Sequence, residues 1–276
     1  MEKIVFLNKT NRKTVIYRLF FYFCKTGIRT FLPNHLFLFF VYQHMKAIFQ
    51  ILCCVAMLAC TKEKHTAMIN SGPMPTGPLK TWLALGDSYT IGQSVSPAER
   101  FAAQTVNILK QDSINTATPD YIATTGWTTT DLANAIQVSN PGTYDVVSLL
   151  IGVNDQYQLH DTTGYRQRFT GLLSKAIQLA NGKKENVFVL SIPDYSVTPF
   201  ASGSDTARIR MEIDWFNAIN KNVTASFNCP YLNITPSTRE AKTNPSLLAP
   251  DGLHPSGQEY RRWADRLAPM MLPVLK

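Results

Sequence analysis

The sequence predicts an α/β protein, with a single three-layer α/β/α domain built on a parallel sheet of about five strands. Three observations predict it. From Thr81 onward, short apolar segments alternate with segments in which apolar residues recur at helical spacing. Residues 146–151 are almost continuously apolar, as expected of a strand that is buried on both faces of a parallel sheet. No internal repeat interrupts the alternation, so the elements are expected to belong to one sheet.

The first part of this domain alternates strands and helices. Residues 82–85 form a predicted buried strand, and Gly86 after it permits a tight turn into the next helix. The pattern over 97–110 predicts a helix that presents Phe101 and Leu109 on one side. The elements that follow are a short strand at 121–123, a helix at 128–137 and the strand at 146–151.

The second part continues the alternation and ends on a helix. Apolar residues recur at helical spacing from Tyr165 to Ala180. The later elements are a strand at 186–192, a helix at 208–225, a strand at 231–234 and a closing helix at 256–267, with Pro255 near its first turn. The alternation is of the flavodoxin-like type, in which loops meet at the carboxyl edge of the sheet and form the ligand site.

The composition is that of a globular enzyme or binding protein with one sizeable core. The chain has 276 residues, of which 45% are hydrophobic and 17% are charged. Most of its net charge of +8 comes from residues 1–44, which hold seven lysines and arginines and one acid. The remainder is nearly neutral, so the charge pattern excludes a polybasic surface for nucleic acid.

Residues 1–44 are expected to lie outside the functional protein. They combine basic residues with aromatic runs and precede a second start at Met45. From Met45 a basic residue, an apolar stretch and a small residue follow in the order of a secretory signal peptide. We expect translation to begin at Met45 and residues 1–44 to be an upstream extension included in error. The alternative is a genuine membrane-associating leader.

Residues 45–60 have the organisation of a signal peptide that ends at a cysteine. The run Met57-Leu58-Ala59-Cys60 resembles the lipobox of bacterial lipoproteins, with methionine where leucine is usual. By this resemblance Cys60 carries lipid, and the protein is exported and anchored on the periplasmic or cell-surface side of a bacterial membrane. Residues 61–80, which contain several Gly and Pro, would tether this anchor to a domain over 81–276.

The predicted loops contain the groups that a serine nucleophile requires. Ser88 follows the first strand at the start of a helix, whose N–H groups can stabilise an anion. His254 and Asp251 lie three residues apart, so one short loop can hold the imidazole against the carboxylate. The other histidines after Cys60 are His65 in the tether and His160 in a polar loop.

Each of these motifs has an ordinary structural explanation when it is taken alone. Gly-Asp-Ser is a common turn and helix cap, and Asp-x-x-His is equally compatible with a cap beside a solvated histidine. Asn154 fits a turn after a strand, and Gly126 by itself indicates only a turn. The order and combination of the motifs therefore carry the functional interpretation.

The four motifs together resemble those of the SGNH (GDSL-type) hydrolases over about residues 82–273. The matching blocks are Gly86-Asp87-Ser88, Gly126, Gly152-Val153-Asn154-Asp155 and Asp251-Gly252-Leu253-His254-Pro255. The resemblance implies Ser88 as nucleophile, His254 as general base and acid, and Asp251 as its orienting partner. It implies an oxyanion hole made by Ser88, Gly126 and Asn154. Tyr89-Thr90 departs from the leucine of many members, which changes the floor beside the serine.

The resemblance implies hydrolysis of an ester through an acyl-serine intermediate, with small acyl groups, such as acetyl, on carbohydrate as the expected substrates. The alternatives are a lysophospholipase or thioesterase, a sugar O-acyltransferase, and a non-catalytic glycan-binding lipoprotein. The expected pocket walls are Trp127, Gln156, Tyr157 and residues 194–200.

Other chemistries lack their sequence motifs. The chain has no Gly-x-Ser-x-Gly elbow, dinucleotide or phosphate-loop motif, or paired-cysteine spacing for a metal. We therefore expect no metal and no organic cofactor. The expected partners are the ester substrate and, through Cys60, the membrane, while the sequence indicates no oligomeric state.

Overall fold

Five parallel strands form the sheet at the centre of residues 77–276, the part of the chain that the computed structural model describes. Their order is β2-β1-β3-β4-β5. The strands are β1 (Trp82–Gly86), β2 (Asp120–Ala123), β3 (Val146–Leu150), β4 (Val187–Leu190) and β5 (Tyr231–Leu232). The order and the parallel pairing confirm the predicted fold class, and the chain reverses its direction of winding between β1 and β3.

The register of the central strands brings three loops to one level of the sheet. Gly86, the last residue of β1, lies opposite Ala123 of β2 and Leu150 of β3. The residues that directly follow these three positions therefore emerge side by side at the carboxyl edge. These loops contain Ser88, Gly126 and Asn154, so the sheet itself brings the three predicted residues together.

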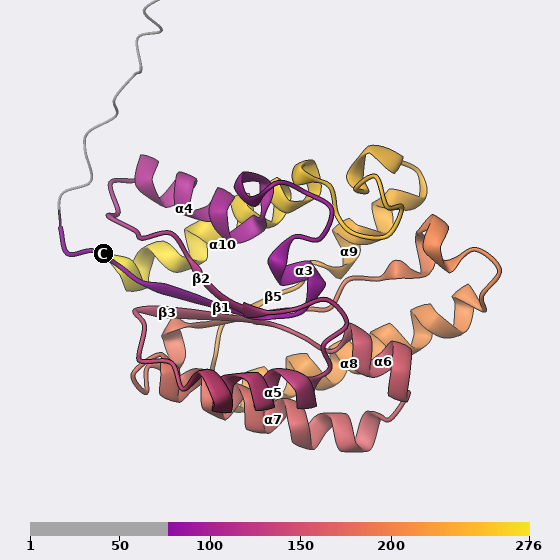
Figure 1. Ribbon diagram of the computed structural model, residues 1–276, viewed down its shortest axis with the longest axis horizontal. Helices are drawn as coiled ribbons and strands as arrows, with labels where there is room; N and C mark the ends of the chain where they lie inside the picture. The colour runs from indigo at the N-terminus through magenta and orange to yellow at the C-terminus, as the bar shows by residue number, and fades with distance from the viewer. Residues whose placement is uncertain (1–76) are drawn as a thin grey trace, which may run out of the picture. The chain divides into compact units, whose positions relative to one another are not determined.

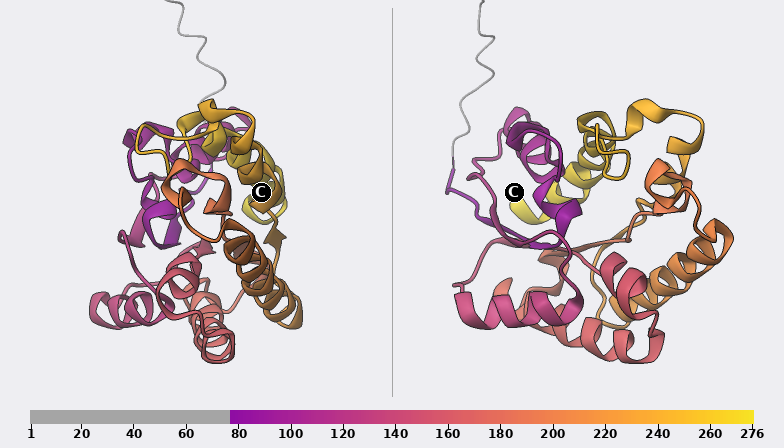
Figure 2. Two further views of the ribbon diagram at one scale, coloured as in Figure 1. Left: turned by 90° about the vertical axis from the view of Figure 1, so that its right-hand side faces the viewer. Right: turned by 45° about the vertical axis from the view of Figure 1, so that its right-hand side comes forward.

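Helices cover both faces of the sheet, which gives the three predicted layers (Figures 1 and 2). One face carries α4 and α10, which make the most extensive helix–helix contact, and the other carries α5, α7 and α8. The helices are α3 (Ser88–Ile91), α4 (Phe101–Gln111), α5 (Thr129–Ser139), α6 (Val153–Leu159), α7 (Thr162–Leu179), α8 (Thr206–Ser226), α9 (Thr235–Thr238) and α10 (Gly257–Leu275). None of the helices within residues 77–276 has the length and apolar character needed to cross a membrane.

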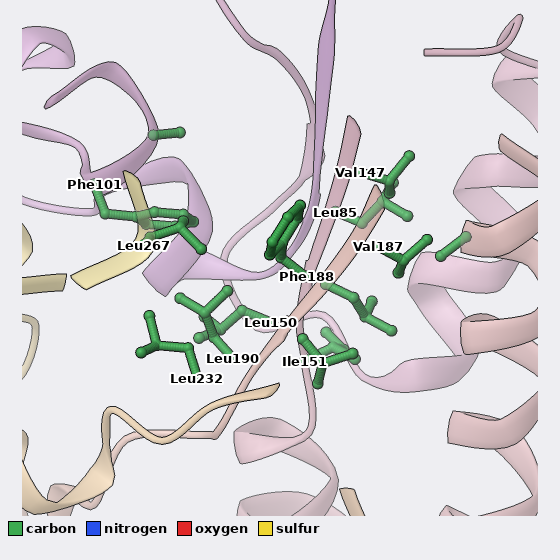
Figure 3. Close-up of a cluster of buried hydrophobic side chains, with 14 of the residues drawn as sticks. Leu85, Phe101, Val147, Leu150, Ile151, Val187, Phe188, Leu190, Leu232 and Leu267 are labelled. Carbon is green, nitrogen blue, oxygen red and sulfur yellow. The ribbon is translucent and has the colours of Figure 1, made fainter. Parts of the chain in front are cut away.

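The core fills the space between the sheet and both helical layers. Figure 3 shows Phe101 of α4 and Leu267 of α10 beside each other against one face of the sheet, while Val147 and Val187 lie on the opposite side. Every residue of β3 and β4 is buried, as the apolar run in the sequence predicts. These buried strands give the loops at the carboxyl edge a rigid support.

Two helices differ from their predicted extents. The predicted helix at 97–110 is a 3-10 turn at Pro97–Glu99 followed by α4, because Arg100 between them is extended (φ −59°, ψ 143°). The closing helix continues past the predicted end at 267, through Pro269 and Pro273, to Leu275. An internal proline costs about 3 kcal/mol, but the last two turns bury apolar side chains that offset this cost.

The predictions for the first part of the chain lie outside the described residues. They are the extension at 1–44, the signal peptide at 45–60, the lipidation of Cys60 and the tether up to residue 76. Lys80, at the end of the predicted tether, forms a parallel bridge with Thr116. The ordered domain therefore includes the last residue of that predicted segment.

Candidate active site

Ser88 is presented by a sharp turn at the end of β1. It is the first residue of α3 and is buried, with 4% of its surface exposed. A side chain at Gly86 would collide with Thr90 and with the carbonyl oxygen of Leu150, so only glycine allows this close approach of the turn to β3. Asp87 caps the helix by accepting a hydrogen bond from the Tyr89 N–H at 3.0 Å.

His254 links the serine to a carboxylate. Its Nε2 lies 2.9 Å from Ser88 Oγ, and its Nδ1 lies 2.7 Å from Asp251 Oδ2. The imidazole stands against the Tyr89 ring, with the ring centroids 4.9 Å apart. With the proton on Nδ1, the Asp251 carboxylate accepts the hydrogen bond from Nδ1–H, and Nε2 is free to take the proton of the serine hydroxyl. The structure thus joins the three predicted residues in one hydrogen-bonded chain.

Asp251 is held in its ionised form by donors on every side. Its Oδ1 accepts hydrogen bonds from the N–H groups of Leu253 and His254, each at 3.0 Å, and Ser94 Oγ donates to Oδ2 at 2.6 Å. Partial burial works to raise the pKa of Asp251, but the hydrogen bonds from Ser94, His254 and the two backbone groups outweigh it and lower the pKa to about 2.

Ser94 is a member of this site that the sequence did not indicate. It adopts a left-handed backbone conformation with φ 66°, in the loop after α3. It lies 157 positions before Asp251 in the chain, so no local pattern connects the two residues. The fold alone brings the hydroxyl to the carboxylate.

Asn154 lies close to the loop that contains Gly126. It is the second residue of α6, and its Nδ2 donates to the carbonyl oxygen of Trp127 at 3.0 Å. A primary amide carries two N–H donors, so the second remains for a ligand. Gln158 Nε2 donates to the Gly126 carbonyl at 3.0 Å, which ties α6 to the same loop a second time.

Asp155 fixes the two segments that supply this part of the site. It is fully buried, and its carboxylate accepts from the Thr129 N–H at 2.8 Å, from the Thr129 hydroxyl at 2.5 Å and from Arg168 at 3.3 Å. Burial raises the pKa of Asp155, and the bonds from Thr129 and Arg168 partly oppose that rise. The start of α6 is thereby attached to the start of α5, directly after the Gly126 loop.

Position 126 requires glycine because of its backbone conformation and not because a side chain would lack space. Its φ is +82°, which other residues rarely adopt, while an added Cβ would contact nothing within 4 Å. The open space in front of it is part of the cavity above Ser88.

A cavity of about 120 Å³ unites these groups. One part of its wall is aromatic, because the rings of Tyr157, Tyr195 and Phe200 pack with centroids 6.0–6.2 Å apart. Tyr157 and Phe200 are about half exposed and form the rim. The cavity is lined by Ser88, Tyr89, Thr125, Gly126, Val153, Asn154, Tyr157, Tyr195, Phe200, Leu253 and His254.

Two of the three residues predicted as pocket walls lie elsewhere. Tyr157 lines the cavity, but Gln156 is fully buried and donates to Glu212 at 2.8 Å. The helical period of α6 explains this, since it places 154 and 157 on the cavity side and directs 156 inward. Trp127 packs its ring against the core and contributes its carbonyl to Asn154. Tyr195 and Phe200 come from the predicted segment 194–200.

The larger hollows of the described domain contain none of these groups. A groove of about 520 Å³ between α5 and α7 and another of about 590 Å³ beside the start of α8 are lined by other residues. Within residues 77–276, no three His, Cys, Asp or Glu side chains are grouped so as to hold a metal ion. Of these three hollows in residues 77–276, the small cavity at Ser88 is the one in which a hydroxyl, an imidazole and an amide converge.

Comparisons with known proteins identify the family and the fold. Residues 84–262 match the model of the GDSL-like Lipase/Acylhydrolase family. No match was found among curated protein sequences. Among solved structures, a lipase/acylhydrolase from Enterococcus faecalis is similar, with 20% identity, a TM-score of 0.54, and coverage of 71% of this chain and 97% of that one.

Two further structures share the fold. An esterase from a Pseudoalteromonas species is 14% identical with a TM-score of 0.52, and the match covers 71% of this chain and 98% of that one. An acetyl xylan esterase, AlAXEase, is 20% identical with a TM-score of 0.53, and the match covers 68% and 97%. The chain belongs to the GDSL-like lipase/acylhydrolase family and is a carboxylic ester hydrolase.

Proposed function

We propose that Ser88 is the nucleophile of an acyl-serine mechanism. Ser88 Oγ attacks the carbonyl carbon of the ester, while its proton passes to His254 Nε2, 2.9 Å away. The tetrahedral intermediate then collapses, and the leaving alkoxide takes the proton back from His254. A water molecule repeats the sequence on the acyl-serine and releases the carboxylic acid. The observation that carries the proposal is the unbroken chain from Ser88 through His254 to Asp251.

Asp251 and the amide side of the cavity stabilise the charges that arise during this reaction. The ionised carboxylate holds Nδ1–H of His254 and stabilises the imidazolium. The oxyanion of the intermediate would bind the N–H groups of Ser88 and Gly126 and the free N–H of Asn154. Such donors are fixed before the reaction begins, so they need no reorganisation in the transition state.

Small acyl groups on carbohydrate are the substrates that the cavity supports best. A volume of about 120 Å³ is small beside the roughly 300–1,000 Å³ typical of pockets for drug-sized ligands. The half-exposed rings of Tyr157 and Phe200 at the rim offer flat apolar surfaces suited to a sugar ring. The acetyl xylan esterase with the same fold is compatible with this substrate class.

The test compares p-nitrophenyl acetate, butyrate and octanoate with acetylated xylo-oligosaccharides, using the full-length protein and Ser88→Ala. We expect the highest kcat/KM for acetyl esters and a loss of about 10⁶-fold in kcat in the variant. Unchanged turnover in Ser88→Ala would contradict the mechanism. A preference for octanoate would favour a lysophospholipase or thioesterase, and acetyl transfer to added sugar that outcompetes water would favour an acyltransferase. Glycan binding without turnover would indicate a binding lipoprotein.

We also propose that the enzyme acts at a membrane surface through lipid on Cys60. The support is the signal-peptide pattern of residues 45–60 and the Gly- and Pro-containing segment behind it. Intact mass of the native protein should show a mature chain that begins at a diacylated Cys60, and Cys60→Ala should leave the membrane fraction. A mature chain that retains residues 1–44 would contradict this assignment.

A further inference from the structure

We propose that Glu212, on α8, is a positioning residue that aligns α6 and thereby aims Asn154 into the oxyanion hole. Glu212 lies outside the cavity and contacts none of its lining residues through a hydrogen bond found in the described chain. Its influence on the reaction would pass through Gln156 and His160. The inference rests on the proposed role of Asn154 and extends it to a second layer of residues.

The carboxylate of Glu212 is buried and fully occupied. Only 6% of the residue is exposed, yet three donors reach it. Arg208 Nε binds Oε1 at 2.7 Å, while Gln156 Nε2 and His160 Nδ1 both bind Oε2, at 2.8 and 2.7 Å. Burial works to raise the pKa of Glu212, but these hydrogen bonds outweigh it and lower the pKa to about 2. The group is therefore a permanent negative charge beside α6.

The two carboxylate oxygens of Glu212 accept hydrogen bonds from different elements. Oε1 accepts a hydrogen bond from within α8, because Arg208 lies one turn before Glu212 on the same helix. Oε2 accepts hydrogen bonds from α6, namely from Gln156 in its last turn and from His160 at its end. A change at Oε1 should thus alter the stability of α8, whereas a change at Oε2 should move α6.

Helix α6 depends on such contacts for its orientation. It has seven residues, and so short a helix is marginal without tertiary support. Its first turn is anchored by Asp155 to Thr129, and its end by Gln156 and His160 to Glu212. Asn154 projects from the opposite side of the helix to Gln156, so a rotation about the helix axis would carry the Asn154 amide away from the oxyanion.

Gln156 also affects the aromatic wall of the cavity, through Tyr195. Burial raises the pKa of Tyr195 to about 12, and the side chain of Gln156 partly opposes this rise. Tyr195 packs against Tyr157 and Phe200 in the cavity wall. Gln156, expected from the sequence to line the pocket, therefore stands directly behind its wall, where Glu212 holds it.

The experiment compares Glu212→Leu, Glu212→Gln and Arg208→Ala on p-nitrophenyl acetate. Glutamine can keep an oxygen at the Oε2 position for Gln156 and His160, whereas leucine removes it. We expect kcat to fall about 10- to 100-fold in Glu212→Leu with KM nearly unchanged, since a misplacement of about 1 Å near the reacting atoms costs up to about 100-fold. Glu212→Gln and Arg208→Ala should retain kcat within about threefold, although Arg208→Ala lowers the Tm.

A double-mutant cycle separates positioning from general destabilisation. If Glu212 acts through Asn154, Glu212→Leu should cause little further loss of kcat in an Asn154→Ala background. His160→Ala, at a half-exposed position that tolerates truncation, provides a second variant with a smaller loss and the same dependence on Asn154. If the kcat losses of Glu212→Leu and Asn154→Ala multiply fully in the double mutant, the proposal is overturned. If Glu212→Leu does not fold, unchanged kcat in His160→Ala overturns it. Unchanged activity in Ser88→Ala would instead overturn the acyl-serine mechanism.

Discussion

Two carboxylates close to Ser88, those of Asp251 and Asp87, have opposite environments. Asp251, on the loop before α10, is partly exposed and accepts hydrogen bonds from Ser94, Leu253 and His254. Asp87, on the turn after β1, is fully buried, and its Oδ2 has no hydrogen-bond partner in the described chain. The pKa of Asp251 is lowered to about 2, whereas burial, aided by the charge of Asp155, raises the pKa of Asp87 to about 8.

The difference shows how one functional group takes two roles around one hydroxyl. In the proposed mechanism, an ionised carboxylate at Asp251 stabilises the positive charge that develops on His254. A neutral acid at Asp87 caps α3 without placing a negative charge beside the oxygen that becomes an anion. Donors keep the first carboxyl ionised, and the lack of solvent keeps the second protonated at neutral pH.

The largest effect should follow from neutralising Asp251. Asp251→Asn removes the charge that opposes the imidazolium and permits the wrong tautomer of His254, so kcat should fall about 10⁴-fold. The matched change Asp87→Asn replaces a group that is already neutral, so at pH 7 it should alter kcat by less than about tenfold. Steady-state kinetics on p-nitrophenyl acetate measures both. Equal losses of kcat in the two variants would contradict the different roles inferred for Asp251 and Asp87.

Asp87 should appear in the pH dependence of stability. Its pKa is raised on folding, so the stability associated with its proton is complete below pH 4 and is lost as pH rises towards 8. The loss between pH 4 and 7 should be roughly 4 kcal/mol. Urea unfolding at several pH values should show a flatter profile in Asp87→Asn than in the wild type. Identical slopes would show that Asp87 is ionised in the folded protein.

Asn154 is the proposed side-chain donor to the anion of the tetrahedral intermediate. Asn154→Ala should lower kcat about 10²- to 10³-fold, because one oxyanion donor contributes about 3–4 kcal/mol. The Tm should change little, since within residues 77–276 the amide forms a single hydrogen bond, to the Trp127 carbonyl. Kinetics and a thermal melt of the same sample check both statements. A large drop in Tm with unchanged kcat would assign Asn154 to the support of the Trp127 loop instead.

Ser94 should give the smallest effect. Ser94→Ala removes one of the donors that lower the pKa of Asp251, so this pKa should rise and kcat should fall about fivefold, equivalent to ~1 kcal/mol for one hydrogen bond. The acidic limb of the pH–rate profile should move to higher pH. Ser96→Ala, which changes a serine of the same loop bound to Glu99, is the matched control. If both variants behave alike, Ser94 acts only on loop stability.

Local patterns predicted the strands of the sheet and most of the helices, and they indicated candidate residues for the reaction. The strands predicted from the hydrophobic pattern coincide with the strands of the sheet. The Asp251 side chain accepts a hydrogen bond from the His254 N–H within one loop, so spacing alone could indicate this pair. The pattern missed α6, because a seven-residue helix after Gly152 resembles a turn. It also ended the last helix at Leu267, before Pro269 and Pro273, which the packing of α10 tolerates.

The sequence by itself determined the α/β class and the order of the motifs, and it predicted Ser88, Asp251 and His254 as partners. These depend on residue types and on spacings of a few positions, and such information is local. Only the tertiary structure decided that Ser94 supports Asp251, that Gln156 stands behind the wall, and that Glu212 holds it. Those contacts join residues 56 to 157 positions apart, and the sheet order and the helix rotation that create them are set by packing of the whole domain.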